Sequence, residues 1–90
     1  MVTAVVLIEA QTDKINELAE RLVEIEAIGE VFSVAGRYDL VAIVRVRENE
    51  DLATVVSDRM RHLGGIVKTE TLIAFRVYSR KDIESVFSAS

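Results

Sequence analysis

The pattern of apolar positions predicts strands that are apolar on both faces. In the first segment, the side chains of Val2, Ala4, Val6 and Ile8 point to one side, and those of Val5 and Leu7 point to the other. Residues 40–47 repeat this pattern. Because side chains alternate across a strand, each segment carries two apolar stripes. Two helices can cover only one face of a small sheet, so we expect a second chain, a ligand or both to cover the other.

The first of two predicted helices spans residues 13–27. Its apolar side chains recur at helical spacing: Ile15, Leu18, Ala19, Leu22 and Ile25. Thr12 is the expected N-cap, and Gly29 is the expected stop signal.

The rest of the chain continues the alternation of strands and helices. We expect a short strand at 31–35, a tight turn at 36–39 and a strand at 40–47. A second helix follows, with an acidic start at 48–51, Asn49 as its cap, an apolar stripe from Leu52 to Leu63 and a stop at Gly64 and Gly65. The last expected elements are a strand at 66–78 and a short helical tail at about 80–88.

The order strand, helix, strand, strand, helix, strand is that of the ferredoxin-like α+β sandwich. Right-handed crossovers then place the first and third strands in the middle of a four-stranded antiparallel sheet, with both helices on one face. We expect residues 1–90 to form a single domain that dimerises by packing sheet on sheet, as in a dimeric α+β barrel.

Composition narrows the function. Half of the 90 residues are hydrophobic, and 11 basic against 15 acidic residues give a net charge of −4. This balance argues against direct binding of nucleic acid. The apolar runs are too short to span a membrane, and we see no export signal, so a cytoplasmic location is expected. The absence of cysteine fits a reducing compartment.

The sequence offers no catalytic constellation. It has no nucleophile elbow, no glycine-rich phosphate loop and no metal-spaced histidines. His62, the one histidine, is expected to face solvent near the end of the second helix. The acidic residues 48–51 are expected to cap that helix, with weak binding of a hard cation as the alternative. We therefore expect a protein that is not an enzyme and needs no cofactor or metal.

Three features in this order resemble a known family. They are the βαββαβ pattern, the Gly-x-x-Asp turn from Gly36 to Asp39, and Gly65-Ile66-Val67 followed by Thr69-x-Thr71. Together they resemble the effector-binding domain of the Lrp/AsnC (feast/famine) regulators, also called the RAM domain. The resemblance covers residues 2 to about 78.

The resemblance implies a homodimer that assembles further, often into octamers, and binds an amino-acid effector between dimers. By motif position the candidate ligand-binding residues are Gly36, Tyr38, Asp39, Thr69 and Thr71. A glycine lets backbone amides approach a carboxylate, and an aspartate can accept from an ammonium group. Residues two apart on a strand point the same way, so both threonine hydroxyls can reach one ligand.

Two departures from the family pattern affect what is implied. The chain starts at the first strand, without the family's helix-turn-helix, so the resemblance is to the stand-alone form and any contact with DNA would go through full-length Lrp/AsnC regulators. Gly64 also stands where family members often have proline, which leaves the entry to the last strand open.

Other interpretations remain open at each site. Gly36 and Asp39 are common hairpin-turn residues, Thr69 and Thr71 suit a strand by propensity, and Tyr38 can serve in packing or a dimer interface. The arginines and lysines are spread over several elements, which suits solvated surface and ion pairs between subunits. As whole functions, a dimeric α+β barrel enzyme of monooxygenase or isomerase type and an architectural partner of full-length regulators are the alternatives.

Overall fold

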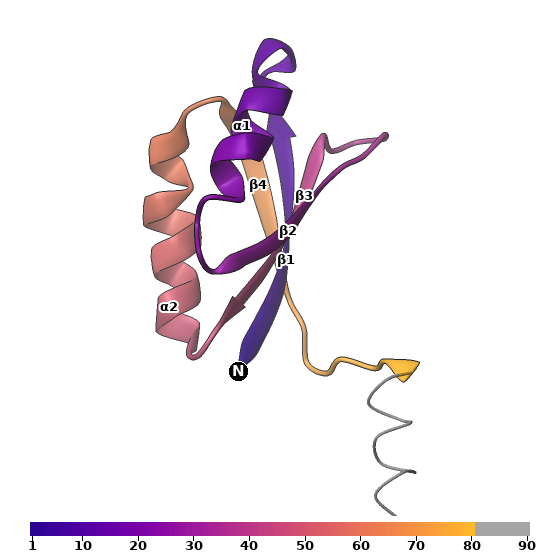
Figure 1. The fold of residues 1–90 in the computed structure, drawn as a ribbon, viewed down its shortest axis with the longest axis vertical. Coiled ribbons are helices and arrows are strands. Elements are labelled where there is room, and N and C mark those ends of the chain that lie inside the picture. The colour runs from indigo at the N-terminus through magenta and orange to yellow at the C-terminus, as the bar shows by residue number, and fades with distance from the viewer. Residues whose placement is uncertain (81–90) are drawn as a thin grey trace, which may run out of the picture.

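A computed structural model describes residues 1–80 of the chain, and these form one sheet with helices on one side (Figure 1). The element order confirms the sequence prediction. In chain order the elements are β1 (Val2–Ala10), a 3-10 turn (Thr12–Lys14), α1 (Ile15–Leu22), β2 (Ile28–Ser33), β3 (Leu40–Val46), α2 (Asn49–Thr54), which continues as a π-helical segment (Val55–Arg59) and a 3-10 turn (Arg61–Leu63), and β4 (Ile66–Ile73).

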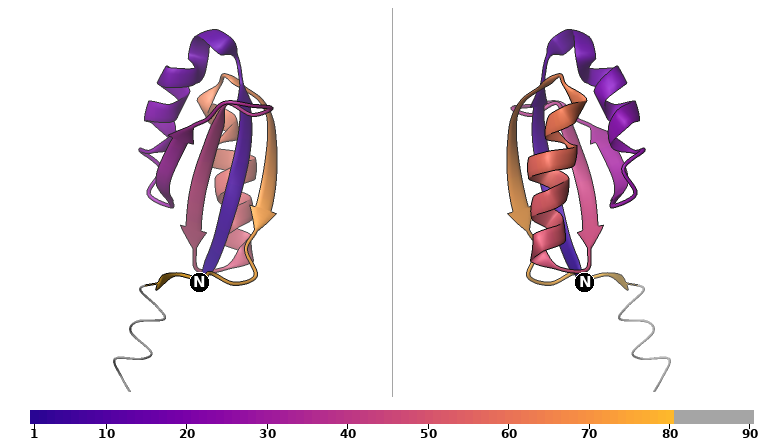
Figure 2. Two further views of the ribbon diagram at one scale, coloured as in Figure 1. Left: turned by 90° about the vertical axis from the view of Figure 1, so that its right-hand side faces the viewer. Right: turned by 90° about the vertical axis from the view of Figure 1, so that its left-hand side faces the viewer.

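The sheet has the strand order β2-β3-β1-β4, and every neighbouring pair is antiparallel. The first and third strands therefore lie in the middle, as predicted for a ferredoxin-like fold. Both helices lie on the same side of the sheet, and the two side views of Figure 2 show a helical face and a bare face. The four-stranded α+β prediction is confirmed.

The core lies between this sheet and its helices. Ala4, Val6 and Ile8 of β1 are fully buried, as are Leu40, Ala42 and Val44 of β3. From the helices, Leu18, Leu22 and Met60 complete the same cluster. The strand residues in this cluster belong to one of the two predicted apolar stripes, and the structure shows that this stripe faces the helices. Burial of each Val, Leu, Ile or Met side chain stabilises the fold by about 1.5–3 kcal/mol.

The other side of the sheet has no cover within residues 1–80, and we call it the open face. Its apolar side chains are Val5, Leu7, Phe32, Val41, Ile43 and Leu72. Phe32 and Leu72 are 48% and 50% exposed, and the four others are half-buried among themselves. The predicted second apolar stripe is therefore present, and it faces away from the helices.

The first helix is shorter than predicted. It ends at Leu22 and not at residue 27. Beyond Leu22 the chain turns through hydrogen bonds between residues three positions apart, including Ile25 N to Leu22 O at 3.0 Å and Ile28 N to Ile25 O at 2.9 Å. This turn keeps Ile25 and Ile28 in the core. β2 consequently spans Ile28–Ser33 instead of 31–35, and the expected stop signal Gly29 lies inside that strand.

Both predicted N-caps are also corrected. Thr12 lies within the 3-10 turn before α1 and makes no capping hydrogen bond. The cap of α2 is Glu48, one residue before Asn49, and it forms a reciprocal capping box with Asp51. The longer Glu48 side chain reaches the backbone at Asp51, while Asp51 Oδ2 accepts from Glu48 N at 3.2 Å.

The turn into β4 depends on its glycines. Gly64 and Gly65 have φ angles of +74° and +85°. Proline fixes φ near −65° and cannot adopt this conformation. Gly65 O accepts from Gln11 N at 2.8 Å, which ties this turn to the end of β1.

β4 ends at Ile73, whereas the sequence predicted a strand that continues to residue 78. Its last bond to β1 is Ala74 N to Thr3 O at 2.9 Å, and β1 begins at Val2, so no partner strand remains. Residues 74–78 leave the sheet and pass to the side away from the helices (Figure 1). The predicted helical tail at 80–88 lies, beyond Arg80, outside the described residues. No helix within residues 1–80 is long and apolar enough to cross a membrane.

Candidate functional site

Gly36 sets the shape of the turn between β2 and β3. Its φ of +130° lies in a region that residues with a Cβ rarely adopt. Nothing lies within 4 Å of the place a Cβ would occupy, so the requirement for glycine comes from the backbone and not from crowding. The surrounding residues 34–37 are exposed, so this turn lies at the surface.

Asp39 fastens this turn to the end of β1. Its backbone N donates to Ile8 O at 2.9 Å, and its carbonyl O accepts from Val34 N at 3.0 Å. Its carboxylate Oδ2 accepts from Ala10 N at 2.8 Å, where the register of β1 shifts after Glu9. Asp39 therefore has a structural role in holding the turn, and within residues 1–80 its second carboxylate oxygen makes no hydrogen bond.

Tyr38 links the same turn to β4. Its hydroxyl donates to Glu70 Oε2 at 2.5 Å. This bond stabilises the neutral phenol and raises the pKa of Tyr38 above 10.0; desolvation and the negative charges of Glu70 and Glu9 act in the same direction, and Arg37 opposes them. Glu70 pairs with Leu7 across the sheet, so this hydrogen bond lies at the open face.

Thr69 and Thr71 face the other side of the sheet. They pair with Ile8 and Val6, whose side chains are fully buried under the helices. The prediction that both threonines point the same way is confirmed. Thr69 is one of the residues that line a groove of about 330 Å³ between β4 and the helical segments that follow α2.

One chain thus brings together three of the five candidate residues. Gly36, Tyr38 and Asp39 share the β2–β3 turn, whereas the two threonines lie across the sheet. The exposed turn can present backbone N–H groups to a carboxylate, and the carboxylates of Asp39 and of Glu70 on β4 can accept from an ammonium group. These are the two groups of an amino acid.

Glu70 was not among the residues singled out from the sequence. The sequence indicated only that Lys68, Glu70 and Leu72 alternate on one face of the last strand. The proximity to Tyr38, 32 residues earlier, follows only from the strand order.

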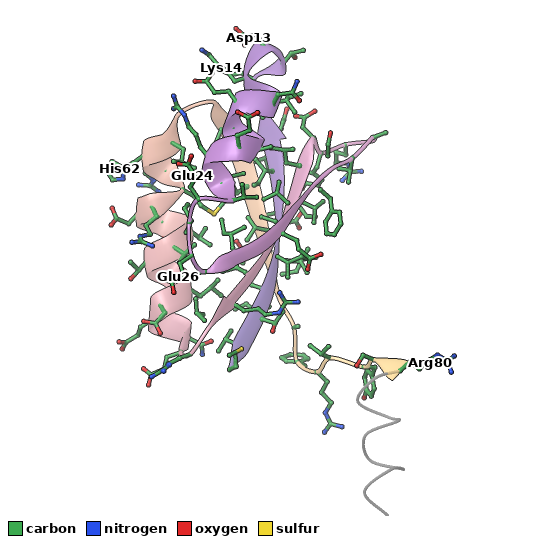
Figure 3. All side chains as sticks on the ribbon, viewed as in Figure 1. Asp13, Lys14, Glu24, Glu26, His62 and Arg80 are labelled. Atoms are coloured by element: carbon green, nitrogen blue, oxygen red, sulfur yellow. The ribbon has the colours of Figure 1, made fainter. Side chains whose placement is uncertain are left out.

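His62 is exposed, as predicted, and pairs locally. Its side chain is 75% exposed, and its Nδ1 lies 2.6 Å from the carbonyl O of Asp58 and 3.4 Å from the Asp58 carboxylate. Because a carbonyl oxygen only accepts, Nδ1 carries the proton in this contact. Figure 3 shows His62 pointing away from the sheet. Among residues 1–80, no group of three or more His, Cys, Asp or Glu side chains is arranged to hold a metal ion.

Comparison with known proteins places this fold and turn in a family. The model of the Lrp/AsnC ligand binding domain matches residues 3–83. The chain belongs to the Lrp/AsnC family. This assignment confirms the resemblance drawn from the motifs, while the roles of the individual site residues stay predictions.

Relatives of this Lrp/AsnC domain are longer proteins. The uncharacterized HTH-type transcriptional regulator PH1916 of Pyrococcus horikoshii is 34% identical over 76 residues, which are 81% of this chain and 51% of that protein. The HTH-type transcriptional regulator FL11 of Pyrococcus furiosus is 31% identical over 77 residues, 86% of this chain and 50% of that protein. The chain spans about half the length of these curated relatives.

A solved structure of similar extent also exists. TTHA0845 from Thermus thermophilus superimposes with a TM-score of 0.83 at 45% identity, over 89% of this chain and all of that one. It confirms that a chain of this size adopts the Lrp/AsnC ligand-binding fold.

Proposed function

We propose that this chain is a non-enzymatic, oligomeric module that binds an amino-acid effector between its copies. Two copies pack through their open faces into a homodimer, and dimers assemble further, up to an octamer. An effector that binds one assembly more tightly than another shifts the population toward it. On this proposal the module acts in the cytoplasm and contacts no nucleic acid itself.

The open face is the observation that carries the proposal. Its six apolar side chains form a continuous surface over all four strands, with Phe32 and Leu72 about half exposed. Soluble monomers rarely leave such a patch bare. Charged side chains surround it on both edge strands, with Glu30 on β2 and Lys68 on β4. An apolar centre with a polar rim is typical of protein–protein interfaces.

The segment after β4 supports the same dimer. Residues 74–78 run to the side of the open face (Figure 1), and the side chains of Phe75, Val77 and Tyr78 are 102%, 61% and 80% exposed. A second copy seated on the open face would meet this arm. The arm would then bury its aromatic side chains against the partner, whereas within its own chain these side chains stay exposed.

The placement of the five candidate residues supports a ligand site shared between copies. The β2–β3 turn and the threonines lie on opposite faces of the sheet, so one chain alone does not surround a ligand with all of them. Assembly of dimers through these surfaces brings the turn of one copy toward the threonine groove of another. The turn contributes acceptors for the ammonium group and amides for the carboxylate.

Sedimentation velocity tests the dimer. Val41→Lys places a charge in the centre of the open face, and Val23→Lys places the same charge at the end of α1, where Val23 is already 52% exposed. We expect the wild type and Val23→Lys to sediment as dimers or larger at micromolar concentration, and Val41→Lys to shift toward monomer. A stable wild-type monomer would overturn the proposed assembly.

Calorimetric titration with the standard amino acids tests the ligand. The panel includes L-methionine, because NMB0573 of Neisseria meningitidis, a protein of the same fold at 11% identity and a TM-score of 0.79, was solved as a complex with L-Met. We expect Glu70→Gln to weaken binding and Glu20→Gln, on an exposed part of α1, to leave it unchanged. Binding by Glu70→Gln that is as tight as that of wild type and Glu20→Gln would remove Glu70 from the site.

The names of the relatives support one alternative partner. They are HTH-type transcriptional regulators in which the matched region is about half of the chain. Because the two proteins would pair through the same open face, we propose that the module can also co-assemble with such a full-length relative. Co-expression with a tagged helix-turn-helix relative tests this: a mixed oligomer that Val41→Lys abolishes supports it, and separate homo-oligomers contradict it.

A further inference from the structure

One end of the open face carries a positive charge. Arg45 alternates with Val41 and Ile43 along β3, so its side chain points to the open face. Its Nη1 atom lies 2.9 Å from where a Cβ on Gly29 would be. Because Gly29 has no side chain, the guanidinium lies across the neighbouring strand β2, close to the surface of the sheet. A second surface can therefore close over this charge.

The opposite end of the open face carries a negative charge. Glu9 continues the alternation that turns Leu7 to the open face, and its side chain is half-buried. The charge of Glu9 contributes to the raised pKa of Tyr38, whose hydroxyl binds Glu70 at this same end. Glu9 thus lies beside the β2–β3 turn, and Arg45 lies far from it.

Neither charge is neutralised by another side chain within residues 1–80. Arg45 pairs across the sheet with Thr3, six residues before Glu9 on β1, so the two groups are about 20 Å apart along the strands. The ion pairs of this part of the chain join residues three or four positions apart on helical segments. Lys68, opposite Glu9 on β4, and Glu30, on β2, take part in none of them.

The six apolar side chains of the open face form a band that runs across all four strands. Phe32 on β2 lies at one end of this band and Leu72 on β4 at the other, and these two are its most exposed members. A second copy covers both ends only if the two bands lie along each other, because crossed bands meet only at the centre. In a twofold dimer this leaves two arrangements, with the strands of the facing sheets running in the same or in opposite general directions.

Charge selects between these two arrangements. With the strands in the same direction, Arg45 meets Arg45 of the second copy, and the two Glu9 carboxylates also meet. With the strands in opposite directions, each Arg45 lies over the Glu9 end of the other copy. Contacts between like charges suppress the first arrangement, and complementary charges fix the second.

We propose that two copies pack with their strands in opposite directions and that Arg45 of each copy pairs with Glu9 of the other. The pairing rests on the dimer of the proposed function and specifies its orientation. The sequence suggested that its scattered cations include ion pairs between subunits, and the fold assigns Arg45 to this role.

The reversed orientation also changes the surroundings of the effector site. The β2–β3 turn lies at the Glu9 end, where the Asp39 carboxylate accepts from Ala10 N. The two turns of one dimer therefore lie at opposite ends, and each receives Arg45 of the other copy. The second copy then contributes a cation beside the proposed amino-acid site, which one chain alone does not supply.

Chemical cross-linking tests the orientation, because the chain has no cysteine of its own. The reagent is a short bismaleimide whose span is well below the roughly 20 Å between the two positions in one chain. We expect the double variant Glu9→Cys/Arg45→Cys to form covalent dimers at micromolar concentration and each single variant to stay largely uncoupled. Coupling of Arg45→Cys alone, as efficient as that of the double variant, would overturn the reversed orientation.

Charge reversal tests the pair in solution. Arg45→Glu and Glu9→Arg each bring like charges together and should raise the dimer dissociation constant about tenfold or more in sedimentation equilibrium. The two substitutions combined restore opposite charges and should return the constant to within about threefold of wild type. The matched controls are Arg61→Glu and Glu20→Arg at exposed positions on helical segments, which should change it less than about twofold.

The outcomes separate this pairing from the dimer itself. A stable wild-type monomer would overturn both. A wild-type dimer that either single reversal weakens, and that the combined reversal does not restore, would overturn the pairing and leave the dimer standing. Rescue of Arg45→Glu by Glu30→Arg or Glu70→Arg in place of Glu9→Arg would indicate crossed sheets and overturn it as well. Far-UV circular dichroism of each variant confirms that the fold is retained.

Discussion

The Tyr38 hydroxyl donates a hydrogen bond of 2.5 Å to Glu70 Oε2, and so connects the β2–β3 turn to the edge strand β4. Asp39, the next residue, binds the backbone of Ala10 at the end of β1. Adjacent residues therefore fasten one turn to two different strands. Because the Tyr38–Glu70 bond lies at the open face, anything that covers that face will change the environment of both groups.

The pH dependence of stability is expected to report this bond. The pKa of Tyr38 is raised above 10.0, chiefly by its bond to Glu70, so the neutral phenol is favoured in the folded state. Its contribution is fully present below pH 10 and is lost as pH rises through the folded pKa. Tyr38→Phe should remove this alkaline loss. Urea denaturation between pH 8 and pH 11 measures it.

Absorbance at about 295 nm gives the same titration directly, since the tyrosinate ion absorbs there and the phenol does not. The sequence has two tyrosines, and Tyr78→Phe leaves Tyr38 as the one that titrates. Glu70→Gln should lower the midpoint by removing a negative charge and a strong acceptor. An unchanged midpoint in Glu70→Gln would show that the bond is not formed in solution.

Asp39→Ala is expected to destabilise the fold by about 1–3 kcal/mol, because it leaves the buried backbone N–H of Ala10 without an acceptor. Asp39→Asn retains an oxygen at the same place and should lose less. Urea denaturation gives both values, with Glu20→Ala on the exposed side of α1 as control. If Asp39→Ala is as stable as the wild type, the carboxylate has no structural role and is available entirely to a ligand.

Gly36→Ala is expected to cost about 1–3 kcal/mol through backbone strain at φ +130°. The new methyl group meets no atom within 4 Å, so the loss should appear as a change in the turn and not as a loss of core packing. Amide exchange measured by NMR should show faster exchange at residues 34–39 and unchanged protection in the centre of β1. Uniform loss of protection would contradict a local effect.

Removal of residues 75–90 is expected to weaken self-association without unfolding the domain. Phe75, Val77 and Tyr78 are exposed, so the core does not depend on them, whereas a partner on the open face would contact them. Sedimentation equilibrium should give a larger dissociation constant for the truncated chain. The midpoint of thermal unfolding, extrapolated to the monomer, should equal that of the full chain. An equal dissociation constant would show that the arm makes no contact with a partner.

Much of the fold followed from short-range patterns. The alternation in residues 2–9 and 40–47 predicted strands with two apolar faces. Helical spacing from Ile15 to Ile25 predicted a helix over residues 13–27, of which α1 covers Ile15–Leu22. These predictions succeeded because the faces of a strand or helix are set by residues two to four positions apart. The errors lie at element ends, such as residues 23–27 and 74–78, where the hydrogen bonds to distant segments decide where an element stops.

The sequence by itself determined the order of the elements and the presence of a second apolar face on the sheet. Its motifs, including the Gly36–Asp39 turn, also indicated the Lrp/AsnC family. Only the tertiary structure decided which polar groups meet. Tyr38 reaches Glu70, 32 residues further along the chain, because the strand order and register fix those positions. A shift of one residue in β4 would turn Glu70 to the helices and the threonines to the open face. Register depends on pairing along whole strands, and no local pattern contains it.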